Sequence, residues 1–116
     1  MAADQPGERI AQFLEDQLFR PVRADDPDRH PPFKRADVEA ARRRVARERE
    51  IVLGAPSASA MVLAFHEAAE RSAATELEEL LRTLGLPTFG AIRDELDKLA
   101  AELAVTAEPT PAGQIS

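Results

Sequence analysis

The fold is decided by residues 57–105, which read SASAMVLAFHEAAERSAATELEELLRTLGLPTFGAIRDELDKLAAELAV. Apolar residues recur in this stretch every three or four positions, the spacing that gathers them on one face of an α-helix. The pattern predicts two helices, 57–84 and 88–105, the first capped by Ser57 or Ser59. Because only a short link separates them, we expect the two helices to run antiparallel as an αα-hairpin.

The link between these helices carries its own stop and start signals. Gly85 suits the left-handed C′ position that ends a helix, and Leu86 can then contact Leu81, as in a Schellman motif. Thr88 is a favourable N-cap for the helix that follows. The pattern therefore predicts one unbroken helix up to this stop and a new helix directly after it.

Two further helices are predicted before the hairpin. The segment 8–19 has its apolar residues on one face, and Pro21 is expected to end it, since proline lacks an N–H and clashes with the preceding turn. The other helix covers 37–53, with Gly54 suited to its C′ position. Between them, residues 20–35 contain four prolines and many charges and are predicted to form a linker.

Length and composition indicate a single all-helical unit. The chain has 116 residues, an ordinary size for one domain, and it is rich in the strong helix formers Ala, Leu, Glu and Arg. We therefore predict an all-α fold, a small bundle of about four helices with the αα-hairpin at its C-terminal end. The expected parts are an amphipathic helix over 1–19, the linker over 20–35, a helical domain over 36–105 and a disordered tail over 106–116.

Charge and composition disfavour several classes of function. The formal net charge of -6 disfavours binding to nucleic acid, which needs a basic surface. The absence of cysteine removes disulfides and thiolate metal sites. No apolar run reaches the roughly 18 residues of a membrane span, and the first residues lack the pattern of a secretion signal. We expect a cytoplasmic protein.

His66, Glu67 and Glu70 form the one cluster of histidine and carboxylates on a predicted helix. His66 and Glu70, four residues apart, could supply two metal ligands, but the chain offers no second helix of this kind. We expect a solvated helix flank and no cofactor; a metal-binding helical bundle assembled from several subunits is the alternative. Because the sequence also lacks a Gly-x-Ser-x-Gly motif and a phosphate-binding loop, an enzyme acting alone is not expected.

Basic residues are concentrated in the segment 34–49. They are Lys34, Arg35, Arg42, Arg43, Arg44, Arg47 and Arg49. The segment is either a patch for phosphate or an acidic partner, or it complements the acidic helices 57–84 and 88–105 of the same fold. Segregated opposite charges commonly set the orientation of neighbouring helices or subunits, which favours the second interpretation.

The long apolar stripe of the hairpin is the predicted association surface. With five Phe and no Trp or Tyr, the chain has few large residues to cover that stripe internally. We therefore expect a non-enzymatic accessory subunit that associates with itself or with a larger partner protein through these two helices. The expected interface residues are Phe65, Ala69, Ala73, Leu77, Leu80, Leu84, Ile92, Leu96, Leu99 and Leu103.

One short motif suggests an alternative function. The turn LGLPT at 84–88, followed by Ile92, Leu96 and Leu99, resembles the C-terminal segment of phasins and related polyhydroxyalkanoate synthase accessory subunits, where such a turn precedes a coiled-coil helix. The resemblance implies binding at a granule surface or to the synthase. In that case the amphipathic segment 8–19 is a second expected contact with the surface.

Overall fold

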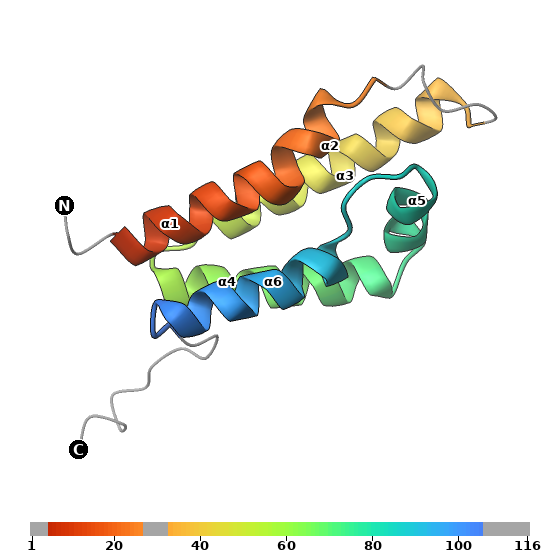
Figure 1. The fold of residues 1–116 in the computed structure, drawn as a ribbon. Helices are drawn as coiled ribbons and strands as arrows, with labels where there is room; N and C mark the ends of the chain where they lie inside the picture. The colour runs from red at the N-terminus through yellow and green to blue at the C-terminus, as the bar shows by residue number, and fades with distance from the viewer. Residues whose placement is uncertain (1–4, 27–32, 106–116) are drawn as a thin grey trace.

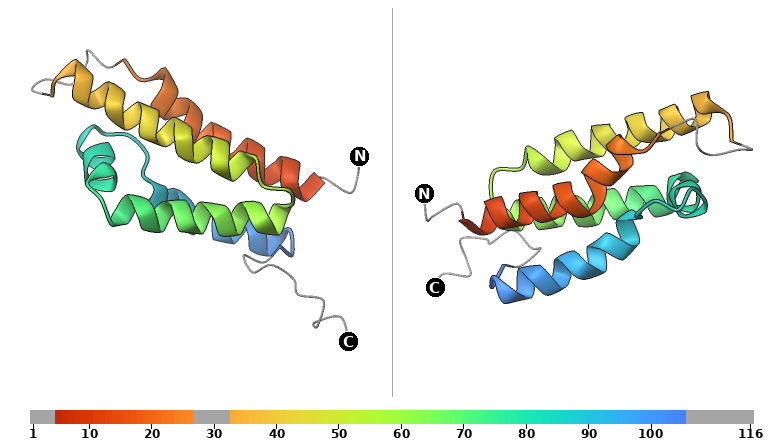
Figure 2. Two further views of the ribbon diagram at one scale, coloured as in Figure 1. Left: turned by 180° about the vertical axis from the view of Figure 1, so that it is seen from behind. Right: turned by 45° about the horizontal axis from the view of Figure 1, so that its top comes forward.

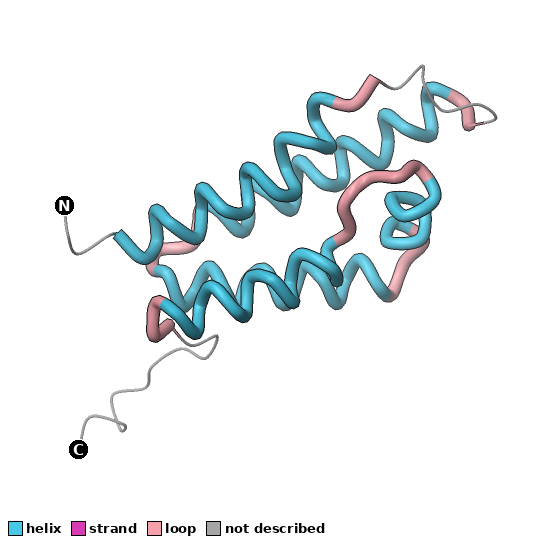
Figure 3. The backbone as a smooth tube through the Cα atoms, in the orientation of Figure 1, coloured by secondary structure: helices cyan, strands magenta, loops and turns pink. Residues whose placement is uncertain are grey.

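The computed structural model describes residues 5–26 and 33–105, and every regular element in these two ranges is a helix (Figure 3). The predicted all-α class is confirmed. Part of the predicted linker, 27–32, and the predicted disordered tail, 106–116, lie outside the described residues.

The first helix continues past Pro21, so the prediction that this proline ends it is wrong. Its three consecutive parts are α1 (Gln5–Leu14), the π-helical turn η2 (Glu15–Phe19) and α2 (Arg20–Ala24). In the π-helical turn the Arg20 N–H donates to the Glu15 carbonyl, five residues back. This wider turn comes directly before Pro21, where the chain lacks a donor, and the helix is able to continue for one more turn.

Four helices follow: α3 (Arg35–Leu53), α4 (Ala58–Ala73), α5 (Leu77–Thr83) and α6 (Phe89–Glu102). The predicted single helix over 57–84 is therefore wrong, because it is broken between α4 and α5. Thr75 explains the break. Its hydroxyl donates to the Ser72 carbonyl at 3.1 Å and accepts the Leu77 N–H at 3.2 Å, which replaces helical hydrogen bonds with local ones.

The predicted stop and start signals around 85–88 are confirmed. Gly85 has φ of +77°, and the Leu86 N–H donates to the Leu81 carbonyl at 2.9 Å, the hydrogen bond that defines a Schellman motif. Thr88 caps α6 by accepting the Ala91 N–H at 3.3 Å. These signals depend on adjacent residues alone, which is why the sequence was sufficient to predict them.

Of the two remaining predictions about helix ends, the cap at Ser57 is confirmed and the left-handed position of Gly54 is wrong. Ser57 caps α4 and accepts the Ala60 N–H at 3.1 Å, as expected. Gly54 follows α3 with φ of −84°, an ordinary right-handed conformation, so it does not occupy the predicted left-handed position.

The helices form two layers (Figures 1 and 2). The continuous helix α1–η2–α2 lies beside α3 in one layer, and α4 lies beside α6 in the other. The chain directions of α4 and α6 are opposite, and the link between them contains α5 rather than the short turn expected from the sequence. Helix α1 contacts both α4 and α6, so the first layer covers the second.

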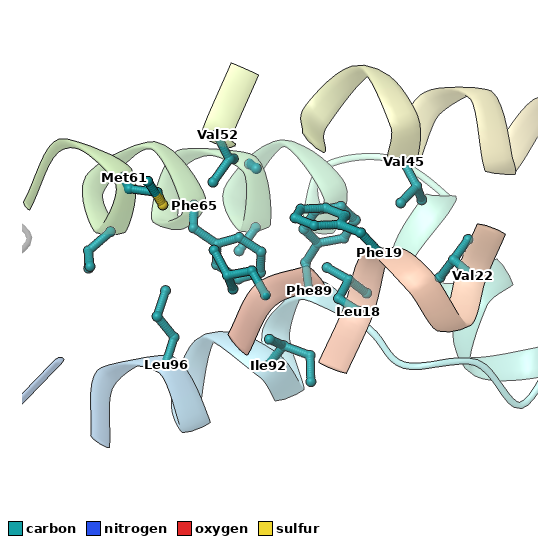
Figure 4. Close-up of a cluster of buried hydrophobic side chains, with 14 of the residues drawn as sticks. Leu18, Phe19, Val22, Val45, Val52, Met61, Phe65, Phe89, Ile92 and Leu96 are labelled. Atoms are coloured by element: carbon teal, nitrogen blue, oxygen red, sulfur yellow. The ribbon is translucent and has the colours of Figure 1, made fainter. Parts of the chain in front are cut away.

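Three phenylalanines from different elements meet in the core (Figure 4). Phe19 of η2 contacts Phe65 of α4 and Phe89 of α6 edge-on, each at a centroid distance of 6.4 Å. Phe65 and Phe89 stack at 5.5 Å. Edge-on and offset aromatic pairs contribute about 0.5–1.5 kcal/mol each beyond their buried area. The cluster therefore ties η2 to the α4–α6 layer.

Candidate functional site

The predicted association stripe is mostly part of this core. Six of its members are buried: Phe65, Ala69, Leu77, Leu84, Ile92 and Leu96. Leu80, Leu99 and Leu103 are half-buried, and Ala73 is exposed. The first helix covers the stripe with Ile10, Leu14 and Leu18, none of which has any exposed surface. The premise that the chain cannot cover its own stripe is therefore wrong.

His66 contacts an acidic residue on the neighbouring helix, whereas the sequence suggested that it and Glu70 could bind one metal ion. Its Nε2 lies 2.6 Å from Asp97 Oδ1 of α6, so the pair links α4 to α6. Glu67 and Glu70 are exposed. Within the described residues, no three His, Cys, Asp or Glu side chains are grouped closely enough to hold a metal ion.

The basic segment makes few ion pairs with the rest of the fold. Arg35 pairs with Glu39 in the same helix, and Arg49 pairs with Glu15 of η2, both at 2.8 Å. Arg44 donates to the Thr75 hydroxyl at 2.9 Å, and Arg42 donates to a backbone carbonyl of α2.

Arg43 and Arg47 are the exposed arginines of α3 that have no partner among the described residues. They lie four positions apart, on the same side of the helix. Two like charges at this spacing oppose helix formation slightly.

No ion pair among the described residues supports the expected complementarity between the basic segment and the acidic helices. The ion pair that joins α3 to α4 has the opposite sense, with Arg71 of α4 binding Glu48 of α3 through two hydrogen bonds of 2.6 and 3.0 Å. This pairing, with burial opposing it, raises the pKa of Arg71. The acidic residues of α5 and α6 pair instead with neighbours such as Arg82 and Lys98. Among the described residues, Arg42, Arg43, Arg44, Arg47 and Arg49 form no ion pair with the acidic residues of α4, α5 or α6.

A groove of about 310 Å³ lies between α2 and α3, next to these arginines. Its floor is formed by Phe19, Val22 and Val45, which occupy one end of the core in Figure 4. Ala46 is exposed in the wall. The charged residues of the lining are Arg23, Arg42, Arg43, Arg49 and Glu39.

Glu15 holds two arginines of this groove in place. Its carboxylate accepts hydrogen bonds from Arg23 at 3.0 Å and from Arg49 at 2.8 Å, and it thereby links α2 to α3. Burial raises the pKa of Glu15, but the hydrogen bonds and charges of Arg49 and Arg23 outweigh it and hold the pKa below its ordinary value. The carboxylate is therefore ionised at neutral pH, and it fixes both guanidinium groups.

The groove was not predicted because residues 20–24 were interpreted as linker. The spacing of Leu14, Leu18 and Val22 contained the missing signal, since it continues the apolar face of the first helix by four residues across Pro21. The lining residues include no Ser, Cys or His, and the one carboxylate among them, Glu39, is paired with Arg35.

Among the described residues, no helix combines the length and apolarity that crossing a bilayer requires. In the comparisons with known proteins, no family model, no curated protein and no solved structure matches this chain.

Proposed function

We propose that this chain is a non-enzymatic helical interaction protein, an accessory subunit that binds an acidic surface of a partner protein through its arginine face. We define the arginine face as Arg43 and Arg47 of α3, which lie four positions apart on one side of the helix. The observation that carries the proposal is that Arg43 and Arg47 are exposed and unpaired by any described residue, in a chain whose net charge is -6.

A concentrated positive surface on an acidic protein is better explained by recognition of a partner than by a contribution to folding stability. Exposed ion pairs contribute little to folding, about 0–1 kcal/mol. Neither arginine of the arginine face forms such a pair with a described residue. A positive patch on a negative body attracts acidic surfaces and orients them during the encounter. The proposed partner surface is therefore rich in carboxylates.

The other functions expected from the sequence receive less support. Self-association through 57–84 and 88–105 requires residues that are mostly buried in the single chain. A phasin-like role was motivated in part by the amphipathic first helix, whose apolar face is covered by the α4–α6 layer. A metal site shared between subunits requires His66, which already contacts Asp97.

The proposal is compatible with the architecture expected from the sequence. We treat α4 and α6 as a C-terminal αα-hairpin interrupted by α5, within a small bundle completed by α1 and α3. In this arrangement the hairpin is the scaffold and α3 provides the binding surface. The cytoplasmic location expected from the sequence stays a prediction.

The test is a comparison of two double charge reversals. Arg43→Glu/Arg47→Glu changes the arginine face, and Arg82→Glu/Lys98→Glu changes the net charge equally on α5 and α6. We expect affinity-tagged wild-type protein to capture an acidic partner from the native host in a salt-sensitive manner, and only the α3 variant to lose it. With the purified partner, the loss of affinity is expected to be about tenfold or more.

The result that contradicts the proposal is equally specific. If the partner binds the two variants equally well, or if its binding is unaffected by salt, the arginine face is not the contact surface. Circular dichroism of both variants separates a loss of binding from a loss of folding.

A further inference from the structure

We infer that the partner contributes an acidic amphipathic helix, whose apolar side chains enter the groove between α2 and α3 while its carboxylates bind the arginines around it. The inference rests on the proposed function and assigns the partner element that the arginine face recognises. It combines the shape, the apolar floor and the charge of the groove.

The groove has room for a few side chains rather than for a folded surface. Its volume of about 310 Å³ is at the lower end of ligand-binding cavities, which range over about 300–1,000 Å³. Phe19, Val22 and Val45 lie at the base of the groove and are each 2% or less exposed, and Ala46 leaves the wall of α3 open because it has only a methyl group. An apolar side chain projecting from a helix fits such a depression.

Positive charge lies on both sides of this floor. Arg23 projects from α2, whereas Arg42, Arg43 and Arg49 project from α3. The one carboxylate in the lining, Glu39, is paired with Arg35. A ligand that matches this pattern has an apolar stripe with carboxylates along both of its edges, which describes an acidic amphipathic helix.

Three of the arginines are oriented before any ligand arrives. Glu15 binds both Arg23 and Arg49, and Arg42 donates to the backbone carbonyl of Arg23. Fixing a guanidinium group in advance lowers the entropy lost when it binds a carboxylate. Arg43 has no partner among the described residues and is available for a new ion pair.

A second copy of this chain is a poorer match for the groove. Its acidic helices can supply carboxylates, but the one large apolar side chain exposed among the described residues is Ile51, which belongs to α3 itself. Within 5–26 and 33–105, such a copy has no acidic helix with a free apolar stripe. Nucleic acid also lacks an apolar stripe to set against the floor. The occupant is therefore a helix from a different protein.

The experiment uses a synthetic helical peptide as the probe. Its leucines are spaced at i, i+3, i+4 and i+7 with glutamates in the other positions, and a scrambled peptide of equal composition lacks the apolar stripe. Binding to the full chain is measured by fluorescence anisotropy. We expect the scrambled peptide to bind at least about tenfold more weakly than the amphipathic one.

Matched variants locate the binding. Ala46→Trp fills the groove without removing an arginine, and Ala101→Trp places the same side chain on the exposed face of α6. We expect Ala46→Trp to weaken binding of the amphipathic peptide about tenfold or more and Ala101→Trp to leave it unchanged. If Ala46→Trp does not fold, Ala46→Glu, which places a carboxylate in the groove, is expected to weaken binding similarly.

The outcomes separate this inference from the proposed function. Equal binding of the two peptides, or no effect of a folded Ala46 variant, overturns the groove inference while the arginine face remains. If the double reversal of Arg43 and Arg47 retains the natural partner, the proposed function is wrong even when the peptide binds. If the protein forms dimers in sedimentation and Ala46→Trp abolishes them, the groove binds a second copy of this chain. That result would overturn the inference.

Discussion

Replacing Glu15 with glutamine tests the electrostatic link between α2 and α3. Glu15 is 15% exposed, while Arg23 and Arg49 are 57% and 40% exposed. Because both arginines are well solvated, each ion pair is assigned the exposed-pair value of about 0.2–1 kcal/mol. Glutamine keeps the shape of the side chain and removes its charge. We therefore expect Glu15→Gln to lower the free energy of unfolding at pH 7 by about 1 kcal/mol.

The effect of Glu15→Gln depends on pH in a defined direction. The folded protein holds the pKa of Glu15 below its ordinary value of 4.5, so between the two values the unfolded chain binds more protons than the folded one. The contribution of Glu15 is complete above the unfolded pKa and is lost as the pH falls through the folded pKa. The difference between wild type and variant is therefore expected at pH 7 and is expected to shrink in strong acid.

Urea unfolding followed by far-ultraviolet circular dichroism measures this difference from pH 7 to about pH 3. Glu79→Gln is the control, because Glu79 also binds an arginine but is 73% exposed, and its loss is expected to cost under about 0.5 kcal/mol. A difference for Glu15→Gln that stays constant across the pH range, or that is no larger than the control, would refute the electrostatic explanation.

Three further substitutions test the helix ends and the core, each by urea unfolding of the variant and wild type. Gly85→Ala places a side chain at φ of +77° and is expected to destabilise the fold by about 1–2 kcal/mol. Glu78→Ala removes the carboxylate that accepts the Phe89 and Gly90 N–H groups at 3.2 and 2.8 Å, and we expect a loss of about 1 kcal/mol. Ser72→Ala removes a buried hydroxyl that has no hydrogen-bond partner in the described structure, and it is expected to stabilise the fold by about 1 kcal/mol.

The predictions that succeeded depend on residues close together in the sequence. The cap at Ser57, the stop at Gly85 and the cap at Thr88 each require only a few neighbouring residues, and all three are confirmed. The break after α4 was missed for the opposite reason. Leu77 and Leu81 continue the helical spacing of apolar residues, whereas the hydroxyl of Thr75 decides the local hydrogen bonding.

The candidate site was predicted in part. The arginines of α3 were identified from the sequence as a concentrated basic segment, but their partners depend on tertiary packing that a charge count does not contain. The expected pairing with the acidic helices required α3 to direct its arginines toward α4 and α6. Instead Glu48 is the α3 side chain that pairs with α4, and Arg43 and Arg47 are exposed.

The continuation of the first helix past Pro21 forms one wall of the proposed binding groove beside α3. The π-helical turn before Pro21 allows one more helical turn, which brings Val22 and Arg23 beside α3. The same continuous helix covers the hairpin stripe, so the apolar surface expected to bind a partner is used within the chain. Without α2 the groove would lose one wall. It would also lose Arg23, which binds the same Glu15 carboxylate as Arg49. The departure from the rule that proline ends helices therefore forms the groove, whereas the stripe is covered by Ile10, Leu14 and Leu18, which precede Pro21.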